Sequence, residues 1–103
     1  MTMTAKPKSK KLQMRENVID LLDEVSEFTF DARMALYNYG DKLSNRSKRR
    51  VCILERLKSE LETLEKYIDD IEVEVVFKRA EQIFNEAQLL SKRLNEEVDS
   101  IEK

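Results

Sequence analysis

The stretch LERLKSELETLEKYIDDIEVEV, residues 54–75, determines the fold that the sequence predicts. Leucine, isoleucine or valine recurs in it at alternating spacings of three and four, and most of the intervening residues are charged. An apolar strip that repeats every 3.5 residues is the seam of a coiled coil. The seam positions are Leu54, Leu57, Leu61, Leu64, Ile68, Ile71 and Val75. The stretch therefore predicts a helix that buries one narrow face against other helices.

A second heptad pattern precedes this strip and predicts an amphipathic helix over residues 12–39. Its apolar positions are Met14, Val18, Leu21, Val25, Phe28, Ala32, Ala35 and Tyr39. Phe30, Met34 and Tyr37 lie outside this seam, so residues 28–39 are apolar on more than one face. Such a helix is expected to pack on more than one side.

Gly40, the only glycine, directly follows this predicted helix. Glycine is common just beyond a helix end because it adopts positive φ at little cost. We therefore predict a break near Gly40, with a continuous helix as the alternative, in which the glycine would cost about 1 kcal/mol. Heptads counted back from Leu54 place Ser47 and Arg50 in the seam, so residues 40–50 are predicted to form a polar, basic connection.

The apolar strip changes register after Val75. Continuing the same heptads would place Lys78, Gln82 and Asn85 in the seam. The apolar positions are instead Val76, Ala80, Ile83, Ala87, Leu90, Leu94 and Ile101, with Phe77 and Phe84 beside them. A shift of this kind at residues 73–77 changes the local winding and lets one helix meet different neighbours. We expect residues 51–103 to form a single coiled-coil helix about 80 Å long.

The composition agrees with an all-α fold: an elongated coiled coil or helical-bundle subunit with two long helices. Charged residues make up 39% of the chain, which holds one Gly and one Pro and so has few turn formers. Residues 1–11 are polar and basic and contain the proline, and we predict a disordered tail there.

Partner helices are expected to complete the apolar strips, because one helix or one hairpin buries little core by itself. The partners expected are other helical protein subunits in a hetero-oligomer, with a homo-oligomer as the alternative. The predicted partner interface comprises Val18, Leu21, Val25, Phe28, Leu54, Leu57, Leu61, Leu64, Ile68, Ile71, Val75, Phe77, Ala80, Ile83, Phe84, Leu90, Leu94 and Ile101.

The sequence does not favour an enzyme. It has no His, one Cys and one Gly, which removes the commonest general base, a thiolate metal site and a phosphate-binding glycine loop. We expect no cofactor, metal or small-molecule substrate. With Leu54 in the seam, Cys52 points outward, and a lone exposed thiol fits a reducing compartment. No apolar run is long enough for a membrane span and the N-terminus lacks a signal sequence, so a cytoplasmic location is expected.

Two basic segments, Lys6–Lys11 and Arg46–Arg50, are the features that would favour binding to nucleic acid or to an anionic membrane. The net charge of −2 argues against nucleic-acid binding by the whole chain. Eight acidic residues between residues 55 and 74 could pair with the second segment, even between copies. We interpret both segments as solvated surface.

The second half of the chain resembles the conserved helical region of subunit 2 of the biogenesis of lysosome-related organelles complex. The similar segments are LKSELETLEKYIDDIEVEV, which begins at Leu57, and EQIFNEAQLLSKRLNEEVDSIEK, which extends to the last residue. The matching features are Leu64, Tyr67, Ile71, Glu81–Gln82, Lys92–Arg93–Leu94 and Glu102–Lys103. The resemblance implies a non-catalytic coiled-coil subunit of an elongated cytosolic complex. Such complexes act in endosome and lysosome trafficking or positioning, with peripheral membrane association through the complex.

Residues 54–75 are also similar, without gaps, to the C-terminal helix of the BRICK-type small subunit of the WAVE actin-regulatory complex. That family's chains stop soon after this point, whereas this one continues for 28 residues. A self-sufficient homo-oligomeric coiled-coil adaptor is the remaining alternative.

Overall fold

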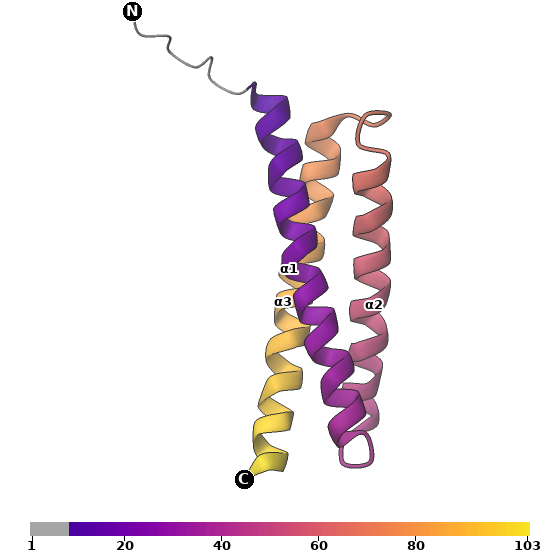
Figure 1. Cartoon of the computed structure of the whole chain (residues 1–103), viewed down its shortest axis with the longest axis vertical. Helices are drawn as coiled ribbons and strands as arrows, with labels where there is room; N and C mark the ends of the chain where they lie inside the picture. Colours follow the sequence, from indigo (N-terminus) through magenta and orange to yellow (C-terminus); the bar gives the residue numbers. More distant parts are fainter. Residues whose placement is uncertain (1–8) are drawn as a thin grey trace, which may run out of the picture.

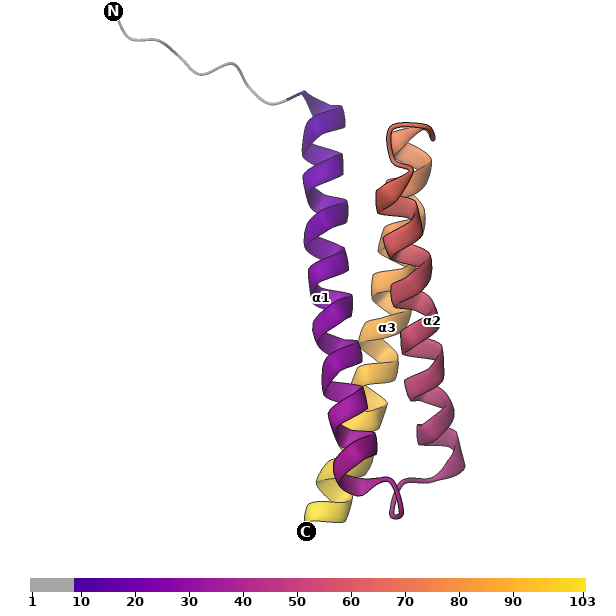
Figure 2. The ribbon, with the colours of Figure 1, turned by 45° about the vertical axis from the view of Figure 1, so that its right-hand side comes forward.

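The computed structural model describes residues 9–103, which form a bundle of three helices and no strand (Figure 1). The helices are α1 (Lys10–Tyr39), α2 (Asn45–Lys66) and α3 (Val73–Glu102). The chain reverses direction at each connection, so α1 and α3 run parallel and α2 runs antiparallel to both (Figures 1 and 2). Each helix packs against the other two. The all-α class is confirmed.

The prediction of one long helix over residues 51–103, and hence of two long helices in all, is wrong. The chain leaves helical geometry at Tyr67, where φ is −105°, and Glu72, with ψ of 122°, is also non-helical before α3 begins. Within the turn between them, the Asp70 amide donates a hydrogen bond to the Tyr67 carbonyl at 3.0 Å, and the Ile68 side chain is buried. Because the two apolar strips differ in register, reversing the chain here lets both face the same core. The helices therefore pack within one chain, and an elongated coiled coil is not confirmed.

The break near Gly40 is present, but its physical reason differs from the one predicted. Gly40 is in right-handed helical geometry, with φ of −48° and ψ of −43°. A Cβ atom at this position would lie 2.6 Å from the carbonyl oxygen of Leu36. Glycine is therefore required for this close approach to the backbone and not for a positive φ. The buried side chain of Leu43 then closes the connection over the end of the core.

The connection is shorter than the predicted residues 40–50, because α2 already begins at Asn45. Ser44 caps this helix: its hydroxyl accepts a hydrogen bond from the Ser47 amide at 3.1 Å. Ser47 is fully buried, and its hydroxyl accepts a hydrogen bond from Arg50 Nη1 at 2.9 Å. The two polar seam positions thus form a local pair inside the first turns of α2.

The start of α1 also corrects the predicted tail over residues 1–11. Ser9 caps the helix by accepting a hydrogen bond from the Leu12 amide at 3.1 Å. Lys10 and Lys11 are consequently helical, so the tail prediction is wrong for these two residues. The rest of that prediction falls on residues 1–8, which lie outside the described residues.

The core extends along the bundle and draws on the apolar strips of all three helices. Its largest fully buried side chains include Leu54 and Leu61 from α2 and Ile83 and Leu94 from α3. In α1 the buried positions are small or β-branched, such as Val18 and Val25, which lets the other two helices approach closely. The remaining members of the core are Ala32, Ala35, Leu43, Val51, Leu57, Ile68, Val73, Val76, Ala80 and Ala87.

Candidate partner interface

The structure places most of the predicted interface residues inside the chain's own bundle. Nine of them are buried: Val18, Val25, Leu54, Leu57, Leu61, Ile68, Ala80, Ile83 and Leu94. Seven more are half-buried against this core: Leu21, Phe28, Leu64, Phe77, Phe84, Leu90 and Ile101. Only Ile71 and Val75 are exposed. The seam is thus completed by helices of the same chain, and a partner would reach its buried members only if the bundle opened.

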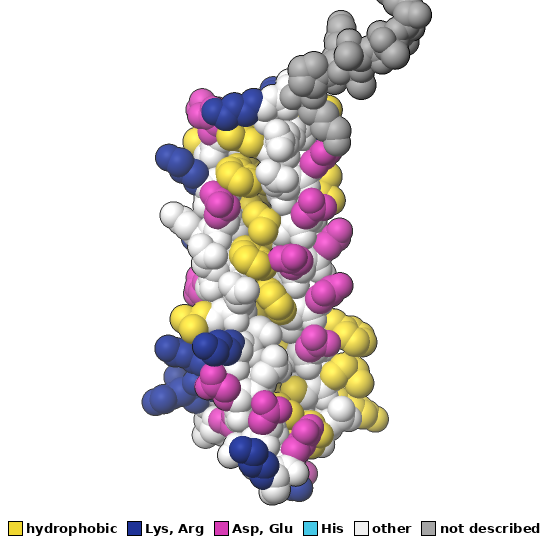
Figure 3. All heavy atoms as spheres, turned by 90° about the vertical axis from the view of Figure 1, so that its left-hand side faces the viewer, with side chains coloured by type: hydrophobic (Ala, Val, Ile, Leu, Met, Phe, Trp, Pro, Cys, Tyr) yellow, Lys and Arg dark blue, Asp and Glu magenta, His cyan; other side chains and the backbone are white. Residues whose placement is uncertain are grey.

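A cluster of exposed apolar side chains lies instead on the outer face of α1. Phe30 is 63% exposed, Met34 is 42% exposed and Tyr37 is 85% exposed. Their spacings of four and three place them on one side of the helix. Figure 3 shows hydrophobic side chains gathered over this C-terminal half of α1. These three residues, the outer α1 cluster, were absent from the predicted interface, although their positions outside the seam already indicated a second apolar face.

A groove runs between α1 and α3. Figure 3 shows an apolar strip along this face of the bundle. One part of it, about 340 Å³ in volume, is lined by the apolar side chains of Leu21, Phe77 and Phe84 and by four polar or charged residues. A second part, about 730 Å³, lies beside Phe28 and Leu89, and Asn85 lines both parts. We refer to the two parts together as the α1–α3 groove. The groove is partly open to solvent and combines a few apolar side chains with many polar and charged ones, which suits contact with an amphipathic helix.

The edge of α1 along this groove is strongly acidic. Residues 16–32 contain six acids and no Lys or Arg. Four of these acids, at spacings of four, three and four, form one row on the helix surface: Asp20, Glu24, Glu27 and Asp31. All four side chains are exposed, and within residues 9–103 none of them forms an ion pair. Figure 3 shows acidic side chains along α1 beside the central apolar strip.

Other charged residues are paired within the bundle and hold its helices together. Arg79 of α3 donates Nε and Nη2 to the two carboxylate oxygens of Glu60 in α2, and the Nη2–Oε1 distance is 2.9 Å. This guanidinium holds the pKa of the Glu60 carboxyl below its ordinary value. Arg33 of α1 donates to Glu55 of α2 at 2.7 Å. Part of the acidic face of α2 is therefore used inside the chain.

Glu97 of α3 is tied to the start of α2 in a similar way. The Ser44 amide donates to Glu97 Oε2 at 2.8 Å, and the Ser44 hydroxyl donates to Glu97 Oε1 at 2.7 Å. These two hydrogen bonds stabilise the carboxylate and lower the pKa of Glu97. Glu97, the polar exception in the second apolar strip, thus has a structural role.

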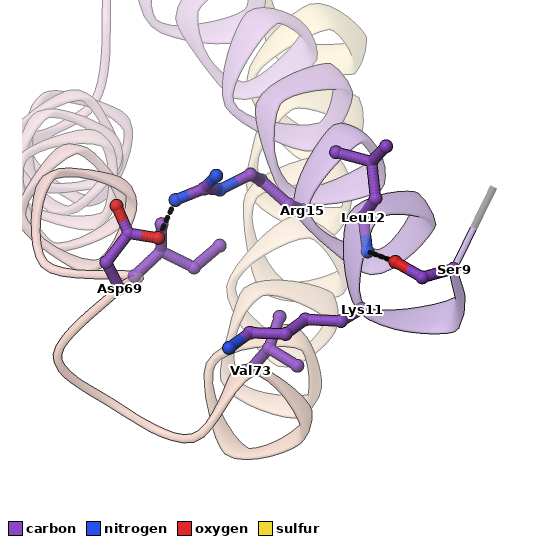
Figure 4. A pocket seen from close by; sticks show the side chains of 7 residues that line it. Ser9, Lys11, Leu12, Arg15, Asp69 and Val73 are labelled. Carbon is purple, nitrogen blue, oxygen red and sulfur yellow. Dashed lines mark hydrogen bonds and ion pairs between the residues drawn. The ribbon is translucent and has the colours of Figure 1, made fainter.

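A small pocket of about 220 Å³ lies between the start of α1 and the turn that joins α2 to α3 (Figure 4). Arg15 reaches across it and forms an ion pair with Asp69 of that turn. Lys11 lines the same pocket, and Lys10 lies 3.9 Å from Glu74. The positive charge of Arg15 is therefore already paired within the chain. We assign this cluster to holding the turn against α1 and not to binding a ligand.

The remaining basic segment, Arg46–Arg50, forms the first turns of α2. Arg46, Lys48 and Arg49 are exposed, whereas Arg50 is half-buried. Cys52 is exposed, as its position outside the seam predicted.

Comparisons of the chain with protein-family models, with curated proteins and with solved structures found no match. Within residues 9–103, no cluster of His, Cys, Asp or Glu has an arrangement suited to holding a metal ion. In the same range, no helix combines the length and apolar character that crossing a membrane requires.

Proposed function

We propose that this chain is a non-catalytic helical subunit that binds other proteins within a multi-protein complex. The observation that carries the proposal is the outer α1 cluster, in which Phe30 and Tyr37 expose 63% and 85% of their surface. Aromatic side chains and methionine are enriched at the centres of protein interfaces, where they supply much of the binding energy. The cluster lies on a regular helix, so the backbone fixes the relative positions of its three residues before a partner arrives.

A finer proposal is that the complex acts in the biogenesis or positioning of endosomes and lysosome-related organelles, from the cytoplasm. Its support is the resemblance of residues 57–103 to subunit 2 of the biogenesis of lysosome-related organelles complex. The turn between Lys66 and Val73 lies inside that segment, so partners would meet a compact pair of helices and not a continuous rod.

The proposal is tested with the double variant Phe30→Ser/Tyr37→Ser of the full chain. Leu12→Ser/Tyr67→Ser is the matched control, because it removes two exposed apolar side chains, 42% and 45% exposed, outside the outer α1 cluster and the predicted interface. Each tagged chain is expressed in cells, crosslinked and isolated, and the co-purifying proteins are quantified. We expect the first variant to lose the partners that the parent and the control retain, with all three chains equally helical by circular dichroism.

Retention of every partner by Phe30→Ser/Tyr37→Ser would contradict the proposed function. The identity of the lost partners tests the finer proposal: endosomal or lysosomal proteins support it, and only actin-regulatory proteins contradict it. Sedimentation of the purified chain tests the homo-oligomeric alternative.

A further inference from the structure

The α1–α3 groove is long enough to hold one more helix. On α3 its lining extends from Phe77 to Asp99, a length of about 33 Å at the rise of an α-helix. Leu21, Phe77 and Phe84 are the apolar residues of its smaller part. Phe28 and Leu89, which is 49% exposed, are the apolar residues of its larger part, whose other lining residues are polar or charged. A helix that lies in this groove would contact both α1 and α3. It would complete a four-helix arrangement with no rearrangement of the core.

The charges around the groove are predominantly negative. Asp20, Glu24, Glu27 and Asp31 form a row at spacings that bring like charges together on a helix, and such pairs destabilise the helix. The bundle itself provides no basic partner for this row within residues 9–103. On α3 the groove is lined by three acids and one base: Glu81, Glu96, Asp99 and Lys92. A cationic occupant would relieve the repulsion along α1.

We propose that the α1–α3 groove binds a basic amphipathic helix of a partner protein, about 20 residues long. Its apolar face packs on the Phe28 and Phe84 side of the groove, and Lys or Arg residues on one flank pair with the acidic row of α1. This inference rests on the proposed function, because it names the kind of partner that the α1 side of the bundle accepts. Charge complementarity selects a basic helix over an acidic or neutral one.

Three synthetic helical peptides of equal length test the proposal against the full-length protein. The first carries a leucine stripe flanked by lysines, the second carries the same stripe flanked by glutamates, and the third scrambles the first so that the leucines share no face. We expect the first to bind at least about tenfold more tightly than the others, and more weakly as salt is added. In an isotope-labelled chain, amide shifts should concentrate at residues 20–31 and 77–99.

A charge-neutralising variant locates the binding to the acidic row. Asp20→Asn/Glu24→Gln/Glu27→Gln/Asp31→Asn should weaken binding of the lysine peptide about tenfold. Glu62→Gln/Glu65→Gln/Asp70→Asn/Glu72→Gln removes the same charge from α2 and the following turn, and should leave the affinity unchanged. All eight substituted residues are on the surface or partly exposed, so both variants are expected to fold, which their thermal melting curves check.

The proposal is overturned if the glutamate peptide binds as well as the lysine peptide, if none of the peptides binds, or if the amide shifts fall outside the groove. A dimer in sedimentation whose interface maps to the groove assigns the site to a second copy and also overturns it. Partner loss in Phe30→Ser/Tyr37→Ser is measured separately in cells. The proposed function therefore stands if that loss occurs while the peptide experiment fails.

Discussion

The aromatic rings of Phe28 and Phe84 stack with centroids 6.0 Å apart and planes inclined by 29°, joining the middle of α1 to the middle of α3. Both side chains are half-buried, so the pair combines apolar burial with a direct ring contact. Replacing a buried Phe with Ala costs about 3–5 kcal/mol, and a half-buried one should cost about 2 kcal/mol.

We therefore predict that Phe84→Ala lowers the free energy of unfolding by about 2 kcal/mol in urea denaturation. Phe30→Ala is the control, because Phe30 is 63% exposed and its loss should change stability by less than about 0.5 kcal/mol. Equal losses for both variants would show that α1 is oriented differently against α3.

The buried seam predicts that the fold is stable without association. Leu61 is fully buried within the bundle, and Leu61→Ala should cost about 3 kcal/mol. The Tm of the parent and of the variant should each be independent of protein concentration, because the seam is completed within one chain. A Tm that rises with concentration would indicate that copies of the chain supply the missing faces.

Gly40→Ala should destabilise the protein by about 1–2 kcal/mol, because the added Cβ would collide with the Leu36 carbonyl oxygen. In an ordinary helical position the same change would stabilise the chain by about 1 kcal/mol. The sign of the change in stability therefore shows whether the Leu36 contact requires glycine at position 40. Asp41→Ala, at the exposed neighbouring position, is the control and should be nearly neutral. Thermal melting of the three chains measures the difference.

Stability should fall in acid partly through Glu97. Its pKa is lowered in the folded protein by the two hydrogen bonds from Ser44, so folding favours the carboxylate form. This stabilisation is complete above the unfolded pKa, near pH 4.5, and is lost as the pH falls through the lower folded pKa. Glu97→Gln should be less stable than the parent at neutral pH and should lose less stability than the parent on acidification.

Melting curves recorded from neutral pH down to about pH 3 measure this difference. Glu96→Gln changes the exposed neighbour of Glu97 and should keep the parent's pH dependence. Parallel profiles for the parent and Glu97→Gln would contradict the role assigned to the Ser44 contacts. The exposure of Glu97 keeps the expected effect small, since solvent screens the interaction.

The heptad spacing predicted which faces of the helices are apolar, and the structure buries most of those positions. Spacing alone could not distinguish a seam completed by other chains from one completed by the same chain, since Leu54 and Leu61 would be buried in either case. The break after Lys66 was missed because residues 67–72 contain no Gly or Pro. The register shift near Val75 is the sequence signal of this break. A shift of this kind is equally compatible with a change of partner along a continuous helix, which is the arrangement predicted from the sequence.

The candidate interface was harder to predict than the core. Phe30 and Tyr37 differ from core positions only by their angle around the helix, so their exposure follows from where α2 and α3 pack. The acidic row was readable from its spacing in the sequence. Its location beside a groove became apparent only when α3 was placed along α1.

The parallel course of α1 and α3 gives the α1–α3 groove a direction (Figure 2). Each helix carries a partial positive charge at its N-terminal end and a partial negative charge at its C-terminal end, so both walls have the same electrical polarity. We expect a docked helix to run antiparallel to both, with its own N-terminus beside Tyr39 and Glu102. A spin label at that peptide terminus should broaden amide signals at this end of the bundle, and broadening near Asn17 would contradict this orientation.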